Sequence, residues 1–299
     1  MICVFFVPGM FGTTVEYVLR AFTNELDNIE AEILPDGSMH SFKTQMHLTN
    51  RDDFVSFFTD RAPLVTVTTP IYPLKDTKLP ELLSICQPSL TINDRRIFVY
   101  ADSAEYAELN MLFQYHKISA SKALQLELDI FCGDNASDIV KWNPLYTHWS
   151  QMKTWELREW FSFFYPGWTQ EWIDASKQVD SLWTKVSTRD LLNDTEQTFK
   201  KIIQISGLSR NHKSLTKFAN DWRQRQQYVL DEHKLINHAV ECIITQVDFS
   251  WSDLNIIAEA MIQNKLREAG FEILCDGLNK FPTNAIEFHK LLMGKNNNA

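Results

Sequence analysis

The residues with the clearest chemical potential lie in one short stretch, residues 8–14, with the sequence Pro-Gly-Met-Phe-Gly-Thr-Thr. An apolar run at residues 3–7 precedes this stretch, and apolar residues at helical spacing follow it over residues 15–22. The order of strand, glycine-bearing turn and helix directs backbone N–H groups and the positive end of a helix dipole to one place, where a phosphate or sulfate binds well. The candidates for anion binding are Gly9, Met10, Phe11, Gly12, Thr13 and Thr14.

A purely structural interpretation of the same stretch stays open. A tight turn between a strand and a helix occurs in any α/β protein, and a threonine at its end would then cap the helix. The pattern that holds ATP or GTP in phosphoryl transferases, GxxxxGK[ST], is absent, and no lysine precedes Thr13. The sequence therefore favours an anion site over a kinase-like phosphoryl-transfer site.

Strands and helices must position this turn, and the sequence predicts them from short apolar runs that alternate with segments of helical periodicity. We expect strands at residues 3–7, 64–68, 97–100 and 183–187, and each is followed by a turn rich in polar residues or proline. Alternation of this kind is typical of a parallel sheet flanked by helices. The turns then gather along the carboxyl edge of the sheet, where open α/β folds bind their ligands.

The second half of the chain reads as mostly helical. Asp194 begins a predicted capping box, and Gly207 suits the end of that helix. Further helices are expected over residues 212–244 and 253–269, a short strand at residues 271–274, and a last helix that Thr283 caps and that ends near Met293. We predict one α/β domain over residues 1–299, in which residues from about 210 onward form either a helical C-terminal subdomain or a cap on the sheet.

Composition narrows the function classes. The formal net charge of −9 disfavours a nucleic-acid binder or a protein of anionic membrane surfaces. No apolar run approaches 18 residues, so we expect neither a membrane span nor a signal peptide. The five cysteines are scattered without a CxxC pair, which favours reduced thiols and a cytoplasmic protein. The eight histidines show no metal-ligand spacing, so we predict no metal site.

Three segments together resemble the sulfotransferase family. Residues 8–14 are similar to that family's 5′-phosphosulfate loop, Pro-Lys-x-Gly-Gly-Thr-Ser/Thr. Residues 97–103, Ile-Phe-Val-Tyr-Ala-Asp-Ser, take the place of its second motif, a strand that ends in arginine. Residues 186–208 follow the family's run of strand, acidic residue, Leu-Leu, Asp-x-Glu, helix and Gly-Leu. The resemblance covers about residues 3–208.

The resemblance implies a P-loop NTPase-like three-layer fold with a mostly parallel sheet, flanking helices and additional C-terminal helices. It also implies transfer of a sulfuryl group from 3′-phosphoadenosine-5′-phosphosulfate to a hydroxyl or amine of a small molecule or glycan, without a metal. The chain departs from the family's pattern at positions where that family uses a side chain to bind or stabilise the donor. Gly9 stands in place of a lysine, Ala101 in place of an arginine that holds the 3′-phosphate, and Leu109 in place of a serine. Asn110, beside Leu109, is a candidate donor to that phosphate.

Residues 41–48 are similar to the Lys-Thr-His stretch that carries a catalytic base in many sulfotransferases, with the histidine displaced by two residues. By this resemblance His47 would take the proton of the acceptor hydroxyl, because a neutral imidazole accepts a proton near pH 7. Lys43 would supply the positive charge that Gly9 lacks. A histidine in a surface loop or at a strand edge explains the same residue.

Two functions from different classes therefore remain. One is a sulfotransferase that moves the sulfuryl group to its acceptor. The other is a catalytically degenerate member of the fold that binds a nucleotide, another anion or a protein partner, as the departures at Gly9 and Ala101 favour. The aromatic segment at residues 155–168 fits core packing, an acceptor pocket or a dimer surface, so self-association also stays open.

Overall fold

We describe the protein from a computed structural model. The structure describes residues 1–6, 11–26, 45–47, 64–68, 91, 93–119, 173–174, 176–177, 179, 181–252, 254, 256–271 and 281–296. The chain divides into two compact units. Unit 1 comprises Met1–Thr147 and Thr169–Gln227, and unit 2 comprises His148–Trp168 and Tyr228–Ala299. The candidate site lies in unit 1.

Unit 1 contains a five-stranded parallel sheet. Its strands are β1 (Ile2–Phe6), β2 (Gln45–His47), β3 (Leu64–Thr68), β4 (Arg95–Tyr100) and β5 (Thr184–Ser187). Their order is β2-β3-β1-β4-β5, and all four strand pairs are parallel. Every residue of β1 is buried, as the uninterrupted apolar run predicts for a strand covered on both faces. The expected α/β class with a parallel sheet is thus confirmed.

The strand predictions agree closely with the structure. The bounds of β3 are those expected, and β1, β4 and β5 differ from the expected strands by one or two residues at an end. The strand β2 was not expected, because its three residues are too few to show the alternation of apolar and polar side chains that indicates a strand. Most of the strand expected at residues 271–274 lies outside the described residues.

The strand order places a topological switch point between β1 and β4. After β1 the chain moves to β2 and β3 on one side, whereas after β4 it moves to β5 on the other side. β1 and β4 are direct neighbours, with Phe6 opposite Val99. Ligands of open α/β sheets bind where neighbouring strands lead away in opposite directions. The turns after β1 and β4 therefore flank the expected binding position.

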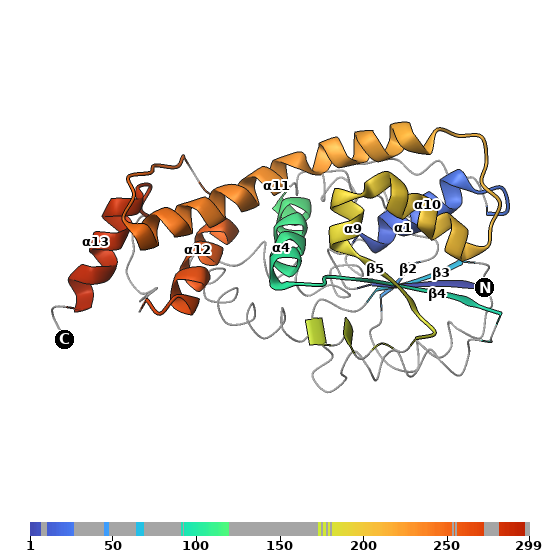
Figure 1. Ribbon diagram of the computed structural model, residues 1–299, viewed down its shortest axis with the longest axis horizontal. Helices are drawn as coiled ribbons and strands as arrows, with labels where there is room; N and C mark the ends of the chain where they lie inside the picture. The colour runs from blue at the N-terminus through green and yellow to red at the C-terminus, as the bar shows by residue number, and fades with distance from the viewer. Residues whose placement is uncertain are drawn as a thin grey trace, which may run out of the picture. The chain divides into compact units, whose positions relative to one another are not determined.

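The helices α1 (Gly12–Phe22) and α10 (Thr195–Ser206) pack against each other over one face of this sheet (Figure 1). Both are amphipathic, with Val15, Val18 and Leu19 of α1 and Phe199 and Ile202 of α10 buried. The chain also pairs in a short antiparallel bridge between Thr23 and Arg210. These contacts hold the position of α1 on the sheet.

The two helices after β5 begin and end at recognisable residues. The hydroxyl of Ser187 caps α9 (Thr188–Asn193) by accepting a hydrogen bond from the Asp190 amide. Asp194 precedes α10 as predicted, although its side chain makes no capping hydrogen bond. Gly207 ends α10 with a φ of 73°, the left-handed conformation that glycine adopts at low cost.

The helix α11 (Leu215–Thr245) contributes its first part to unit 1 and its remainder to unit 2. Unit 2 also contains α12 (Ile256–Glu268) and α13 (Ala285–Asn296). The prediction that Thr283 caps the last helix is wrong. The side-chain oxygen of Asn284 accepts hydrogen bonds from the amides of Ile286 and Glu287, because residue 284 directly precedes the first helical residue.

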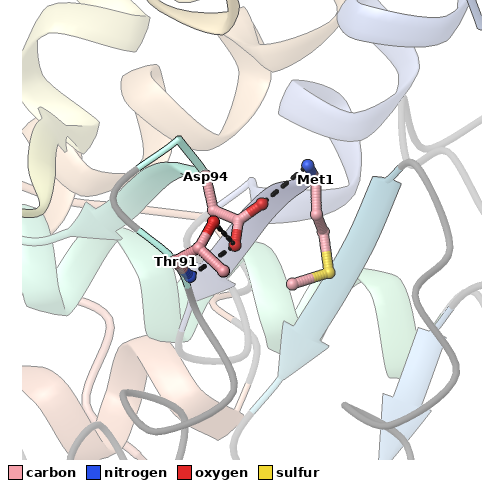
Figure 2. A network of polar contacts seen from close by, with 3 residues as sticks. All are labelled: Met1, Thr91 and Asp94. Carbon is pink, nitrogen blue, oxygen red and sulfur yellow. Dashed lines mark hydrogen bonds and ion pairs between the residues drawn. The ribbon is translucent and has the colours of Figure 1, made fainter.

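The amino group of Met1 contacts the residue before β4, the strand that pairs with β1 (Figure 2). It forms a 2.8 Å ion pair with Asp94, which directly precedes β4. The same carboxylate accepts hydrogen bonds from the amide and the hydroxyl of Thr91. Burial alone would raise the pKa of Asp94, but these hydrogen bonds and the amino group outweigh it and lower the pKa below the ordinary 3.8.

We expect Asp94→Asn to lower the free energy of unfolding by about 2 kcal/mol at pH 7, because hydrogen bonds to a charged group are lost. The folded pKa of Asp94 is depressed, so its contribution is present above pH 3.8 and is lost as the pH falls through the lower folded value. Urea unfolding between pH 7 and pH 2 measures both effects. The exposed Asp231→Asn is the control, and an equal change in both variants would contradict the prediction.

Candidate functional site

The N-terminus of α1 lies directly after the central strand β1, at the carboxyl edge of the sheet. Phe11 occupies the N-cap position, so Thr13 and Thr14 are helical residues and not caps. No side chain caps this helix end, and the amides of Gly12, Thr13 and Thr14 have no partner in the described part of the chain. Uncapped N–H groups at a helix start are where an anion binds. Gly9 and Met10 lie outside the described residues.

Phe11 adopts a conformation that residues other than glycine rarely adopt, with φ 61° and ψ 23°. The loop pattern of the sulfotransferase family has a glycine at this position. Here the ring of Phe11 packs edge-on against two other rings, at 4.7 Å from Phe113 and 5.1 Å from Trp222. These aromatic contacts offset the backbone strain and hold the start of α1 in place.

Gly12 has a packing role that the anion-site interpretation did not consider. A Cβ atom at this position would collide with the ring of Phe6, the last residue of β1. The absence of a side chain therefore lets α1 begin immediately beside the end of its strand. This close approach is what brings the free amides of the first turn to the edge of the sheet.

A buried ion pair lies one turn further along α1. Glu16 is fully buried, and its Oε1 accepts a 2.9 Å hydrogen bond from Nε of Arg20. A carboxylate so near the helix start would by itself oppose a bound anion. The guanidinium of Arg20 offsets that charge, so Glu16 does not exclude an anion at the first turn.

Asn110 occupies a fully buried position on α4 (Ala104–Ser119), at the carboxyl ends of β4 and β5. Its Nδ2 donates a 3.4 Å hydrogen bond to Oγ1 of Thr188, and that hydroxyl donates to the backbone oxygen of Tyr100. Thr188 is the first residue of α9, and Tyr100 is the last residue of β4. The amide nitrogen that we expected to serve a phosphate is thus already engaged by a protein oxygen.

Arg189 was not foreseen as part of the site. Its Nε lies 3.2 Å from Oδ2 of Asp102, and its guanidinium lies over the ring of Tyr106 at 5.3 Å. The Tyr106 hydroxyl accepts a hydrogen bond from Nδ2 of Asn193. The sequence signals for Arg189 were its position two residues after a predicted strand and its place in the segment 186–208.

The electrostatic balance beside β4 and β5 is acidic. Burial raises the pKa of Tyr100 above its ordinary value of 10, and the carboxylates of Asp102 and Asp190 raise it further, while Arg189 opposes them. Tyr100 is therefore a neutral phenol at pH 7. Two carboxylates face one guanidinium at this part of the edge, so the potential there does not favour a phosphate.

The two residues predicted to act in catalysis are His47, the base candidate, and Lys43, the cation candidate. His47 is the last residue of the edge strand β2, where its backbone pairs in register with Thr68 of β3. Two strand spacings, about 10 Å, separate β2 from β1, so the backbone of His47 ends at the same edge as the start of α1. Lys43 lies outside the described residues. The roles predicted for both residues stay predictions.

No protein-family model, curated protein or solved structure matches this chain. Within the described ranges, no group of three or more metal-ligating side chains comes together. No helix in that part of the chain is both long and apolar enough to cross a bilayer.

Proposed function

We propose that the carboxyl edge of β1, β4 and β5 binds a nucleotide of the 3′-phosphoadenosine-5′-phosphosulfate type, and that the protein transfers its sulfuryl group to an acceptor. One observation carries this proposal. The three segments that resemble the sulfotransferase motifs follow β1 in the sequence and overlap the carboxyl ends of β4 and β5, and these are three neighbouring strands of one parallel sheet. Their turns therefore meet at one edge, as a shared ligand requires.

In the proposed reaction the 5′-phosphosulfate lies against the first turn of α1, where Gly12, Thr13 and Thr14 offer amides without partners. A hydroxyl or amine of a small molecule or glycan attacks the sulfur in line. The bond from sulfur to the bridging oxygen breaks, and adenosine 3′,5′-bisphosphate leaves. His47 is the proposed proton acceptor, and Lys43 the proposed cation beside the leaving oxygen. The free thiols of Cys3 and Cys242 fit our placement in the reducing cytoplasm.

A second candidate function has its own support. Position 9 carries no lysine, position 101 carries no arginine, and Arg189 is already paired with Asp102. A site with so few available cations fits a degenerate member of the fold that binds a nucleotide or another anion without transferring a group. The fold alone does not distinguish the two candidates.

Calorimetric titration with adenosine 3′,5′-bisphosphate, AMP and ATP tests the proposed binding site. We expect micromolar affinity for the bisphosphate and weaker affinity for the other two. Equal binding of all three nucleotides would contradict donor specificity, and no binding of any would contradict the site. Incubation with sulfur-labelled donor and a panel of hydroxyl and amine acceptors then tests transfer.

Gly9→Lys separates the active enzyme from the degenerate protein. Removing one stabilising donor from a transition state typically costs about 10²–10³ in kcat, so restoring a cation in a degenerate site should raise a weak transfer rate by a similar factor. Gly9→Met is the matched control, because it adds a side chain of similar length without charge. An equal rate in both variants would show that the charge at position 9 is not the missing component.

A further inference from the structure

The buried amide of Asn110 has one atom that finds no hydrogen-bond partner among the described residues. Its Oδ1 is closed to solvent and accepts no hydrogen bond, although the residue is fully buried. Leaving a buried acceptor without a donor costs about 1–3 kcal/mol. Such a group in a folded protein calls for an explanation, for example a ligand or a water.

The orientation of this amide follows from the hydrogen-bond chain. The Thr188 hydroxyl has a single hydrogen, which it donates to the Tyr100 carbonyl, so its oxygen must accept from Asn110. Nδ2 of Asn110 therefore faces Thr188, and Oδ1 is the atom left over. An acceptor oxygen repels a phosphate oxygen and pairs with an N–H or O–H group.

The position of Asn110 links this oxygen to the start of α1. Phe113 lies three residues further along α4, so the two side chains share one face of the helix with about 5–6 Å between their Cβ atoms. The ring of Phe113 contacts Phe11, which directly precedes α1. Asn110 thus contacts the start of α9 and lies on the face of α4 that carries Phe113, the neighbour of Phe11. The carboxylates of Asp102 and Asp190, which act on the Tyr100 side chain, also disfavour a phosphate near the end of β4.

We infer that Asn110 is a specificity-determining residue whose Oδ1 accepts a hydrogen bond from an N–H or O–H group on the nucleoside part of the ligand. This inference rests on the proposed nucleotide site and reverses the expectation that Asn110 donates to a phosphate. The donor on the ligand is an amine of the base or a hydroxyl of the sugar. Asn110 then reads the neutral part of the nucleotide, and the amides of α1 bind the charged part.

The test compares Asn110→Leu with the wild type for three probes: 3′-AMP, 5′-AMP and adenosine 3′,5′-bisphosphate. We expect Asn110→Leu to weaken all three by about the same factor, roughly tenfold, because a loss common to both monophosphates cannot come from either phosphate. Asn264→Leu is the matched control. Asn264 is also buried with an unpartnered amide atom, but it lies in unit 2, and we expect it to leave all three affinities within twofold.

If the wild-type protein binds the probes, either of two results would overturn the inference and leave the proposed function intact. A loss confined to probes that carry one particular phosphate would mean that Asn110 contacts that phosphate. Unchanged affinities would mean that a water or the fold alone accounts for Oδ1. If Asn110→Leu does not fold, Asn110→Ser removes the same acceptor, and the same pattern is expected of it.

If the wild type binds none of the probes, the proposed nucleotide site fails, and the unfolding midpoint then shows whether Asn110 is retained for a ligand or for the fold. A leucine of similar size removes an unsatisfied oxygen, so a residue retained for a ligand predicts an unchanged or higher unfolding midpoint. A lower midpoint would show that Asn110 serves the fold and would overturn the inference.

Discussion

Trp222→Ala is expected to lower the free energy of unfolding of unit 1 by about 3–5 kcal/mol, as full truncation of a buried tryptophan does. Trp222 is 1% exposed and lies on the part of α11 that belongs to unit 1. Its ring meets Phe11 at 5.1 Å and Phe199 at 5.7 Å, both edge-on. Removing the indole of Trp222 opens a cavity beside Phe11, the residue that directly precedes α1. Urea unfolding followed by circular dichroism measures the loss.

Trp222→Phe is the informative companion variant. The indole Nε1 of Trp222 has no hydrogen-bond partner in the part of the chain that the structure describes, so replacing the indole by a phenyl ring breaks no hydrogen bond there. We expect it to cost about 1–2 kcal/mol, because most of the aromatic contact with Phe11 survives. Leu182→Ala, at a side chain that is 61% exposed, should change stability by less than about 0.5 kcal/mol. Similar losses in all three variants would contradict the proposed anchoring role.

The second large effect concerns the buried ion pair of α1. Arg20→Met should lower the free energy of unfolding by about 3–5 kcal/mol, because it leaves the Glu16 carboxylate without this charge partner in a fully buried position. Glu16→Met should cost a comparable amount by leaving the guanidinium of Arg20 without that carboxylate. Methionine is a good helix former, so neither change disturbs α1 through backbone propensity.

The double variant Glu16→Met/Arg20→Met completes a double-mutant cycle. Replacing a whole buried ion pair by apolar residues of similar volume is often neutral or stabilising, so we expect the double variant to be close to the wild type. Denaturant unfolding of the four proteins gives the coupling between the two residues. Additive losses in the double variant would mean that Glu16 and Arg20 stabilise α1 through separate contacts.

Much of the fold of unit 1 was predictable because it is encoded in short segments. Leu64–Thr68 is a strand because its residues are apolar or β-branched and a turn follows. Gly207 ends α10 because glycine alone adopts φ 73° without strain. The three residues of β2 were missed, since an edge strand this short depends on its pairing with β3.

The candidate site was predictable only in outline. A glycine-bearing turn between a strand and a helix located the start of α1 by local pattern alone. The left-handed Phe11 was not foreseen, because its strain is offset by Phe113 and Trp222, which lie far away in the sequence. The pairing of Arg189 with Asp102 was equally hidden, since 87 positions separate them in the chain.

The sequence by itself determined the α/β class, the parallel sheet and the place where α1 begins after β1. These features depend on periodicity and turn residues, which involve only residues close together in the chain. Only the tertiary structure decided what surrounds that place. In the folded protein Nδ2 of Asn110 donates to Thr188, Oδ1 of Asn110 has no donor among the described residues, and Asp102 pairs with Arg189. Hydrogen bonds and ion pairs act over a few ångströms, so they depend on which distant segments the sheet order brings side by side.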